Sequence, residues 1–158
     1  MRREDREIKD IKAIEEILLK CKTCHVAMTD GSLPYVVPLS YGYRFTDGGA
    51  LELFFHSALH GKKLDMLKIN NKVCFEISDE GEPTRTETPC NSGYYYSSMI
   101  GYGEAVFIDD AVGKCEGLSA IVRHQINRDV DFTEEQAENV CVFKIISNDF
   151  SGKQKHKP

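Results

Sequence analysis

The sequence lacks an excess of positive charge. Its 20 lysines and arginines face 25 aspartates and glutamates, which gives a formal net charge of -5. A chain with this balance has no global basic field to attract nucleic acid or an anionic membrane surface. We therefore expect neither as a partner, and any site for an anion must be local.

Long apolar runs are also missing. No segment approaches the roughly 20 apolar residues that a membrane-spanning helix needs. The first residues, MRREDREIKDIKAIEEILLKCK, carry acidic side chains throughout and lack the apolar centre and small-residue cleavage site of a signal peptide. The sequence therefore predicts a cytoplasmic protein.

The cysteines lack the partner patterns of zinc and redox sites. Cys21 and Cys24 form a CxxC pair, but no second close pair of ligands follows, as a zinc ribbon requires. The pair also lies where a predicted helix gives way to a strand, whereas a thioredoxin-like pair begins a helix. We expect free thiols in a reducing compartment and no metal site.

The remaining composition is ordinary for a globular chain. The protein has 158 residues, of which 41% are hydrophobic and 28% charged, so we expect one domain over residues 1–158. Its N-terminal part, residues 1–22, is predicted to form an amphipathic helix, because apolar residues recur there at intervals of three and four. These residues are Ile8, Ile11, Ile14, Ile17, Leu18 and Cys21.

Six segments are predicted to be β-strands. The turn signals TDGSLP and TDGG separate the first three, TCHVAM, YVVPLSYGYRF and ALELFFHS, which therefore form a meander. The other three are KVCFEIS, YYYSSMIGYGEAVFI and VCVFKIISNDF. Tyr41 and Tyr43 are expected to pack in the core or in an interface.

Helices and loops separate the later strands. Helices are expected in GKKLDMLKINN, DDAVGKCEGLSAIVRHQI and DFTEEQAENV, and residues 79–93 are expected to form a long exposed loop. An antiparallel barrel accommodates six meandering strands without long exposed edges. The sequence thus predicts a mainly β protein, a six-stranded antiparallel barrel with peripheral helices.

A polar cluster ends the third strand, in the sequence FFHSALHGKK. The first amides of a helix are unpaired and its dipole is positive at that end, so Ser57, Lys62 and Lys63 could bind a phosphate. A Walker loop is excluded, because its upstream glycine is missing and a lysine follows Lys62. The alternative is that Gly61 makes a turn and the lysines cover a solvated helix face.

Taken in order, six motifs along the chain resemble one protein family: MRREDREI, VPLSYGY, LFFHSALHGKKLDML, VCFEI, YYYSSMIGYGEAVFI and FSGK. They are similar to the nitroimidazole-resistance branch of the pyridoxamine 5′-phosphate oxidase-like flavoproteins. The resemblance implies a split β-barrel that forms a homodimer and binds FMN at the dimer interface.

The resemblance also implies roles for individual residues. It places the backbone of Val37, Pro38, Leu39 and Ser40 beside the isoalloxazine ring, and Ser57, Lys62 and Lys63 on the phosphate. Ser97, Ser98 and Ile100 would approach the flavin from another strand. His56 matches a position that is often histidine in this branch, and both a catalytic and a structural role are open to it.

Two functions follow from the resemblance. One is a reductase in which FMN takes a hydride from NADH or NADPH and passes electrons to a small acceptor, such as a nitroimidazole, another nitroaromatic compound or a quinone. The other is a flavin- or haem-binding carrier or sensor without turnover of its own. Oxidation of vitamin B6 is not expected, because the oxidase places arginines around the phosphate where this chain has lysines.

Overall fold

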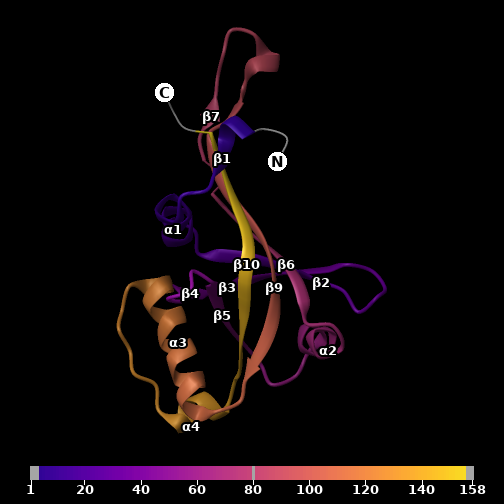
Figure 1. Cartoon of the computed structure of the whole chain (residues 1–158), viewed down its shortest axis with the longest axis vertical. Coiled ribbons are helices and arrows are strands. Elements are labelled where there is room, and N and C mark those ends of the chain that lie inside the picture. The colour runs from indigo at the N-terminus through magenta and orange to yellow at the C-terminus, as the bar shows by residue number, and fades with distance from the viewer. Residues whose placement is uncertain (1–3, 80, 156–158) are drawn as a thin grey trace.

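An antiparallel sheet that curls into a barrel forms the body of the protein (Figure 1). The computed structural model describes residues 4–79 and 81–155. The strand order in the sheet is β3-β2-β6-β9-β10-β5-β4, and β1 pairs with β10. The strands are β1 (Glu7–Ile8), β2 (Thr23–Met28), β3 (Tyr35–Ser40), β4 (Gly42–Phe45), β5 (Leu51–Ser57), β6 (Lys72–Asp79), β9 (Tyr96–Ile108) and β10 (Cys141–Lys155). The predicted fold class is confirmed.

The two edges of this sheet belong to one segment of chain. β3 and β4 lie at opposite ends of the strand order, yet only Tyr41 separates them in sequence. The predicted strand YVVPLSYGYRF is therefore broken in two, with its first half paired to β2 and its second half to β5. This break closes the sheet into a barrel and leaves it split where the two halves part.

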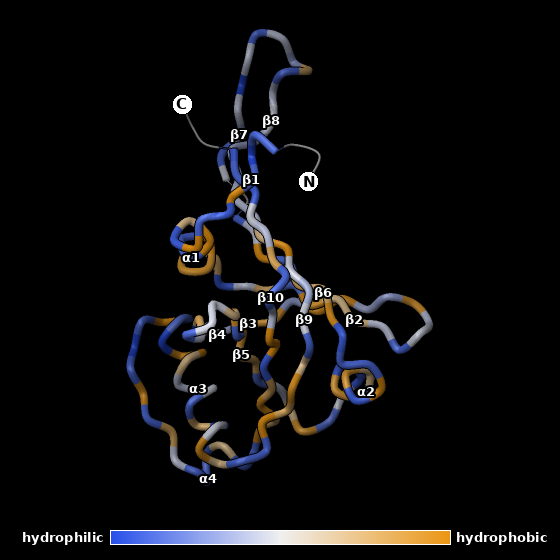
Figure 2. The backbone as a smooth tube through the Cα atoms, in the orientation of Figure 1, coloured by the Kyte–Doolittle hydropathy of each residue, from blue (hydrophilic) through white to orange (hydrophobic). Residues whose placement is uncertain are grey.

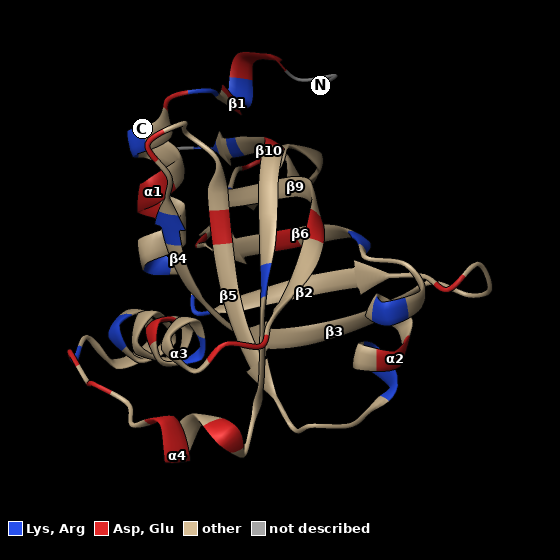
Figure 3. Ribbon diagram, turned by 60° about the horizontal axis from the view of Figure 1, so that its bottom comes forward, with Lys and Arg blue, Asp and Glu red and all other residues tan. Residues whose placement is uncertain are grey.

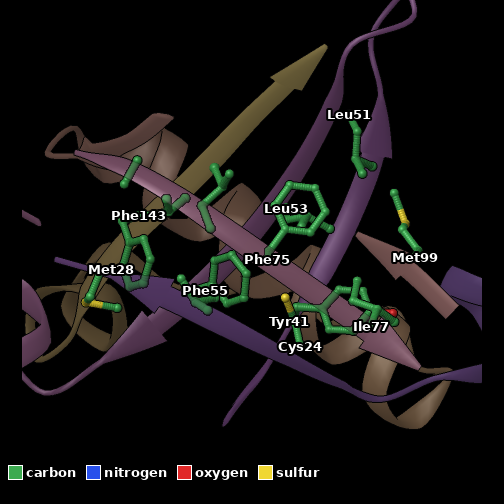
Figure 4. Close-up of a cluster of buried hydrophobic side chains, with 14 of the residues drawn as sticks. Cys24, Met28, Tyr41, Leu51, Leu53, Phe55, Phe75, Ile77, Met99 and Phe143 are labelled. Carbon is green, nitrogen blue, oxygen red and sulfur yellow. The ribbon is translucent and has the colours of Figure 1, made fainter. Parts of the chain in front are cut away.

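The core fills the inside of the barrel. Residues alternate between the faces of β5, so that Leu51, Leu53 and Phe55 point inward and are fully buried. Phe55 stacks on Phe143 of β10 with ring centroids 5.2 Å apart (Figure 4). Burial of such a side chain contributes about 1.5–3 kcal/mol. Apolar segments accordingly line the middle of the barrel in Figure 2.

Helices cover the barrel from two sides. α1 (Ile11–Lys20) and α3 (Ala111–Ile126) lie on one side of it, and α2 (Lys62–Ile69) lies on the other (Figure 1). The short α4 (Glu134–Glu138) is capped by Thr133, whose side chain makes a capping box with Gln136. The predicted helices after residues 60, 109 and 131 are thus present.

The first helix starts later than its periodicity predicts. The Asp10 carboxylate accepts a hydrogen bond from the Ala13 amide at 3.2 Å and caps α1, so the helix begins at Ile11. Ile8 lies instead in β1, paired with Gly152, after the 3-10 turn Glu4–Arg6. The predicted helix over residues 1–22 is wrong in its first part, and residues 1–3 lie outside the described residues.

The predicted long loop contains a short β-hairpin. Within residues 79–93, β7 (Pro83–Thr84) pairs with β8 (Gly93–Tyr94), and a 3-10 turn at Pro89–Asn91 lies between them. The ends of β9 and β10 carry this hairpin away from the barrel (Figure 1).

All six cysteines are free thiols. Among the described residues, no helix combines the length and apolar character needed to cross a membrane.

Gly42 allows α3 to press against β4. A Cβ atom at this position would lie 2.4 Å from the carbonyl carbon of Ala120, which is backbone and cannot rotate away. We expect Gly42→Ala to lower the free energy of unfolding by about 1–3 kcal/mol, as overpacked sites do. Urea denaturation followed by circular dichroism measures this change.

Gly48→Ala is the matched control, because the nearest atom to its added Cβ is the Thr46 hydroxyl oxygen at 3.8 Å. Equal unfolding free energies for the two variants would show that α3 does not depend on this close approach.

Candidate functional site

The site begins where β3 leaves β5. β4 pairs with β5 up to Gly42 opposite Phe54, and the same register continued would set Ser40 opposite His56. Instead, Ser40 pairs with Thr23 of β2. β3 ends the strand order on its other side, so that edge of its backbone has no strand partner among the described residues.

A glycine turn and the start of α2 follow β5, and we call this turn, with Ser57, Lys62 and Lys63, the cradle. Gly61, with φ 147° and ψ 159°, adopts a conformation that favours glycine, and α2 begins directly after it. The Gly61 carbonyl accepts from the amides of Leu64 and Asp65 at 2.9 and 3.2 Å. The amides of Lys62 and Lys63, in contrast, precede the first intrahelical donors and remain available to an anion.

Lys62 and Lys63 carry these amides, whereas Ser57 directs its hydroxyl proton to a backbone carbonyl. Ser57 is buried at the end of β5, and its hydroxyl donates to the Ala58 carbonyl at 2.9 Å. Lys62 and Lys63 add two positive charges at the positive end of the helix dipole, where Figure 3 shows α2 beginning in basic residues. The three predicted phosphate residues therefore lie on one turn and its flanks.

A tyrosine joins the cradle to the edge strand. The Lys62 ammonium lies 4.4 Å from the centroid of the Tyr35 ring, at the start of β3. This cation–π contact brings the unpaired edge of β3 next to the first turn of α2. Sequence analysis missed Tyr35, because only the fold reveals which residue of β3 lies beside Lys62.

The four residues predicted to line the flavin ring lie in this edge strand. The side chains of Val37 and Leu39 pack against the core, whereas Pro38 and Ser40 are exposed on the outer face of the sheet. Pro38 has no N–H to donate, and it pairs with His25 of β2. The four predicted residues thus alternate between the core and the outer face of this edge strand.

His56 and Ser57 point to opposite faces of β5. Ser57 is buried with Phe55, whereas His56 is exposed beside Val142 of β10. A structural role in the core is therefore excluded for His56, since the ring lies on the outer face. It is close in sequence to the cradle but turned away from the side of Ser57.

The residues of β9 do not join the cradle within one chain. Ser57 lies opposite Cys141 at the start of β10, whereas Ile100 lies opposite Ser151, ten residues further along that strand, which is about 33 Å at the usual rise per residue. Ser97 is buried and Ser98 partly buried, while Ile100 is 48% exposed on the outer face. The structure therefore leaves Ser97, Ser98 and Ile100 apart from Lys62 and Lys63.

On the outer face of the sheet, an ion pair lies between Pro38 of β3 and Ile100 of β9. The register aligns Pro38, His25, Glu76 and Ile100 in one row across the sheet. The Nδ1 atom of His25 lies 3.1 Å from Oε2 of Glu76, and both side chains are partly exposed, so the pair adds little stability. Sequence analysis missed this pair, since it depends on the register of three strands.

Comparison with known proteins identifies the family of this chain. A family model described as pyridoxamine 5′-phosphate oxidase matches residues 10–154, which is nearly the whole chain. The chain belongs to the pyridoxamine 5′-phosphate oxidase family. A search of curated protein sequences found no match.

One solved structure is similar enough to indicate the branch of the family. A candidate 5-nitroimidazole antibiotic resistance protein from Bacteroides thetaiotaomicron is 32% identical, with a TM-score of 0.79 over 93% of this chain and 85% of the other. This match supports the nitroimidazole-resistance branch of the family, so the resemblance stated from the motifs is confirmed.

More distant structures share the fold. An FAD- and haem-binding protein from Mycobacterium smegmatis has a TM-score of 0.83 at 16% identity, covering 96% of this chain and 74% of that one. A flavocytochrome from Azotobacter vinelandii has a TM-score of 0.81 at 20% identity, covering 100% and 73%. The names of these two proteins describe flavin and haem groups. At 16% and 20% identity, the matches show only that this chain shares their fold.

Proposed function

We propose that this family member is an FMN-dependent reductase that takes a hydride from NADH or NADPH and reduces a small acceptor, such as a nitroimidazole or another nitroaromatic compound. The observation that carries the proposal is the cradle of Ser57, Lys62 and Lys63 beside the unpaired edge of β3. We place the reaction in the cytoplasm, where reduced nicotinamides are regenerated.

The cradle would hold the phosphate of FMN. A phosphate dianion needs charge-assisted donors, each of which is worth about 1.5–3 kcal/mol, and the two lysines with the first amides of α2 supply them. Val37, Pro38, Leu39 and Ser40 would line the ring, with the free backbone edge of β3 facing its polar atoms. FMN itself, when bound, supplies the hydride and electron transfer.

We further propose a homodimer with FMN at its interface. Exposed apolar and aromatic side chains lie on the outer face of the sheet, where Val36 is 54%, Ile100 48% and Tyr102 58% exposed. Neighbouring exposed side chains of this kind suit a contact with another protein. A second copy on this face would bring its own Ser97, Ser98 and Ile100 towards the cradle.

His56 is proposed as the proton donor to the acceptor. Its ring is exposed on the outer face directly before Ser57, and histidine titrates near neutral pH. A flavin- or haem-binding carrier without turnover is the competing function. Under that function, neither His56 nor a reduced nicotinamide would affect the state of the flavin.

The phosphate assignment is tested by the double variant Lys62→Ala/Lys63→Ala. We expect FMN affinity to fall at least about 100-fold, since two charge-assisted contacts are lost. The free energy of unfolding should change little, because exposed lysines contribute little to stability. Equilibrium dialysis and urea denaturation measure the two quantities.

Lys68→Ala/Lys72→Ala makes the same change in charge away from the first turn of α2 and should leave FMN affinity within about twofold. Unchanged affinity in the Lys62→Ala/Lys63→Ala protein would refute the cradle.

The dimer is tested by Ile100→Lys. Light scattering should give twice the 17.9 kDa chain mass for the flavin-loaded wild type. Burying a lysine charge at the centre of an interface is costly, so the variant should be monomeric at micromolar concentration and lose FMN. Val112→Lys on α3, where Val112 is 64% exposed, is the control and should remain a dimer. A monomeric wild type would contradict the proposal.

The reductase function is tested by anaerobic stopped flow. NADH or NADPH should bleach the yellow wild-type protein, and a nitroaromatic acceptor should restore the colour. In His56→Gln, a side chain that still forms hydrogen bonds replaces one that can transfer a proton. We expect this variant to keep FMN and to reoxidise about 100-fold more slowly.

His60→Gln, in the exposed turn of the same segment, serves as control and should behave as the wild type. A protein that binds FMN but is bleached by neither nicotinamide is a carrier or sensor. Normal rates of flavin reduction and reoxidation in His56→Gln would remove His56 from the site and would leave the reductase function intact.

A further inference from the structure

A second hollow lies away from the cradle. It is a groove of about 860 Å³ between α1, β4 and the last turns of α3. Figure 1 shows these elements together on one side of the barrel, whereas α2 and the cradle are on the other. The volume is within the range of small-molecule sites, which is about 300–1,000 Å³.

Aromatic rings form the floor of this groove. Tyr43 and Phe45 alternate on one face of β4, with ring centroids 6.3 Å apart, and the His124 ring lies edge-on to Tyr43 at 5.4 Å. Rings in such a set offer both faces and edges to a flat ligand. The floor therefore favours a planar aromatic molecule.

An apolar edge of α1 forms one wall. Ile11 and Leu19 line the groove and are 44% and 56% exposed, although the adjoining face of the same helix, with Ile14, Ile17 and Leu18, is buried in the core. Packing of the barrel thus uses one face of α1 and leaves this edge uncovered. A ligand that covered Ile11 and Leu19 would gain about 25 cal/mol for each Å² of apolar surface removed from water.

His124 presents an acceptor to the groove. Its Nε2 atom lies 2.9 Å from the Cys21 carbonyl, which can only accept, so Nε2 carries the proton and Nδ1 is left as the acceptor. Burial, and then the charge of Lys22, lower the pKa of His124, and the ring is neutral at pH 7.

Lys22 and Arg123 line the mouth of the groove. Lys22 donates to the carbonyls of Leu19 and His124 at 3.0 and 2.7 Å, which uses two of its three N–H groups. Arg123 donates through Nε to the exposed Asp129, which leaves the terminal nitrogens of its guanidinium for a ligand.

Glu15 is the one carboxylate that lines the groove, and it is already engaged. It accepts from the Tyr43 hydroxyl; burial first, then the Glu15 charge and this hydrogen bond, raise the pKa of Tyr43 to about 12. Arg44 also lines the groove, but it is held by Glu52, with Nε and Oε2 2.5 Å apart, as Arg123 is held by Asp129. Lys22 is therefore the lining cation without a carboxylate partner among the described residues, and the terminal nitrogens of Arg123 can add donors beside it.

We propose that the α1–β4–α3 groove binds a planar aromatic carboxylate, with its ring over Tyr43, Phe45 and His124 and its carboxylate at Arg123 and Lys22. A planar, bidentate guanidinium matches a carboxylate, and the aromatic floor matches a ring. The site is separate from the cradle and does not depend on the reductase function.

Naphthalene-2-carboxylate is the probe for this site. Isothermal titration of the full-length protein, with and without FMN, should show one probe per chain, and amide resonances of Tyr43, Ala120 and His124 should shift in ¹H–¹⁵N spectra. Arg123→Gln should weaken binding about tenfold through loss of the charge. Leu19→Glu should weaken it at least as much, because it places a like charge on the wall.

Two variants and a neutral probe provide the controls. Arg128→Gln and Ile126→Glu make the same changes at exposed positions just outside the groove and should leave affinity within about twofold. Naphthalene-2-carboxamide should bind the wild type about tenfold more weakly than the carboxylate and should not respond to Arg123→Gln.

Three results would overturn the proposal. The first is the absence of saturable binding, and the second is an equal loss of affinity in the control variants. The third is a probe that competes with FMN or shifts residues 61–63, since it would then occupy the cradle. Melting temperatures of all variants confirm that each protein is folded when it is titrated.

Discussion

The structure depends on the anchoring of Tyr41 between β3 and β4. This side chain is fully buried, and its hydroxyl lies 2.9 Å from the Leu18 carbonyl and 3.0 Å from the Cys21 carbonyl, at the end of α1. The amide of Gln125 in α3 holds the Tyr41 carbonyl at 2.9 Å. These contacts fix the point at which one half of the strand must turn to β2 and the other to β5.

The break at Tyr41 bears on the anion site proposed for this chain of net negative charge. Because β3 departs from β5, the end of β5 does not have β3 as a paired strand. Donors in the first turn of α2 then need not compete with hydrogen bonds between strands. In the proposed site, two lysines and two helix amides would supply the donors, and no basic surface would be needed elsewhere.

Much of the fold could be predicted from the sequence, because strand alternation and helix periodicity are local. The six predicted strands and the capped helices α3 and α4 are present, and the cluster from Ser57 to Lys63 was correctly placed at a strand-to-helix turn. The break at Tyr41 could not be predicted, since apolar alternation continues through it. Only the packing of Gly42 against Ala120 and the hydroxyl contacts of Tyr41 reveal it.

Contacts between residues distant in the sequence could not be predicted either. Tyr35 beside Lys62, His25 beside Glu76 and the groove along Ile11 and Leu19 all join segments that are distant in sequence. Sequence analysis also extended α1 back to Ile8, because the periodicity does not reveal where Asp10 caps the helix. Each of these features depends on register or helix placement, which a pattern of residue types does not encode.

The contact between Lys62 and Tyr35 has a consequence for the entropy of binding. A free lysine side chain loses up to about 2 kcal/mol of rotamer entropy when it is immobilised. In this protein the Tyr35 ring already restrains the ammonium at 4.4 Å, so part of that loss occurs on folding. In the proposed site, an anion entering the cradle would therefore meet a preorganised charge and recover more of its interaction energy as affinity.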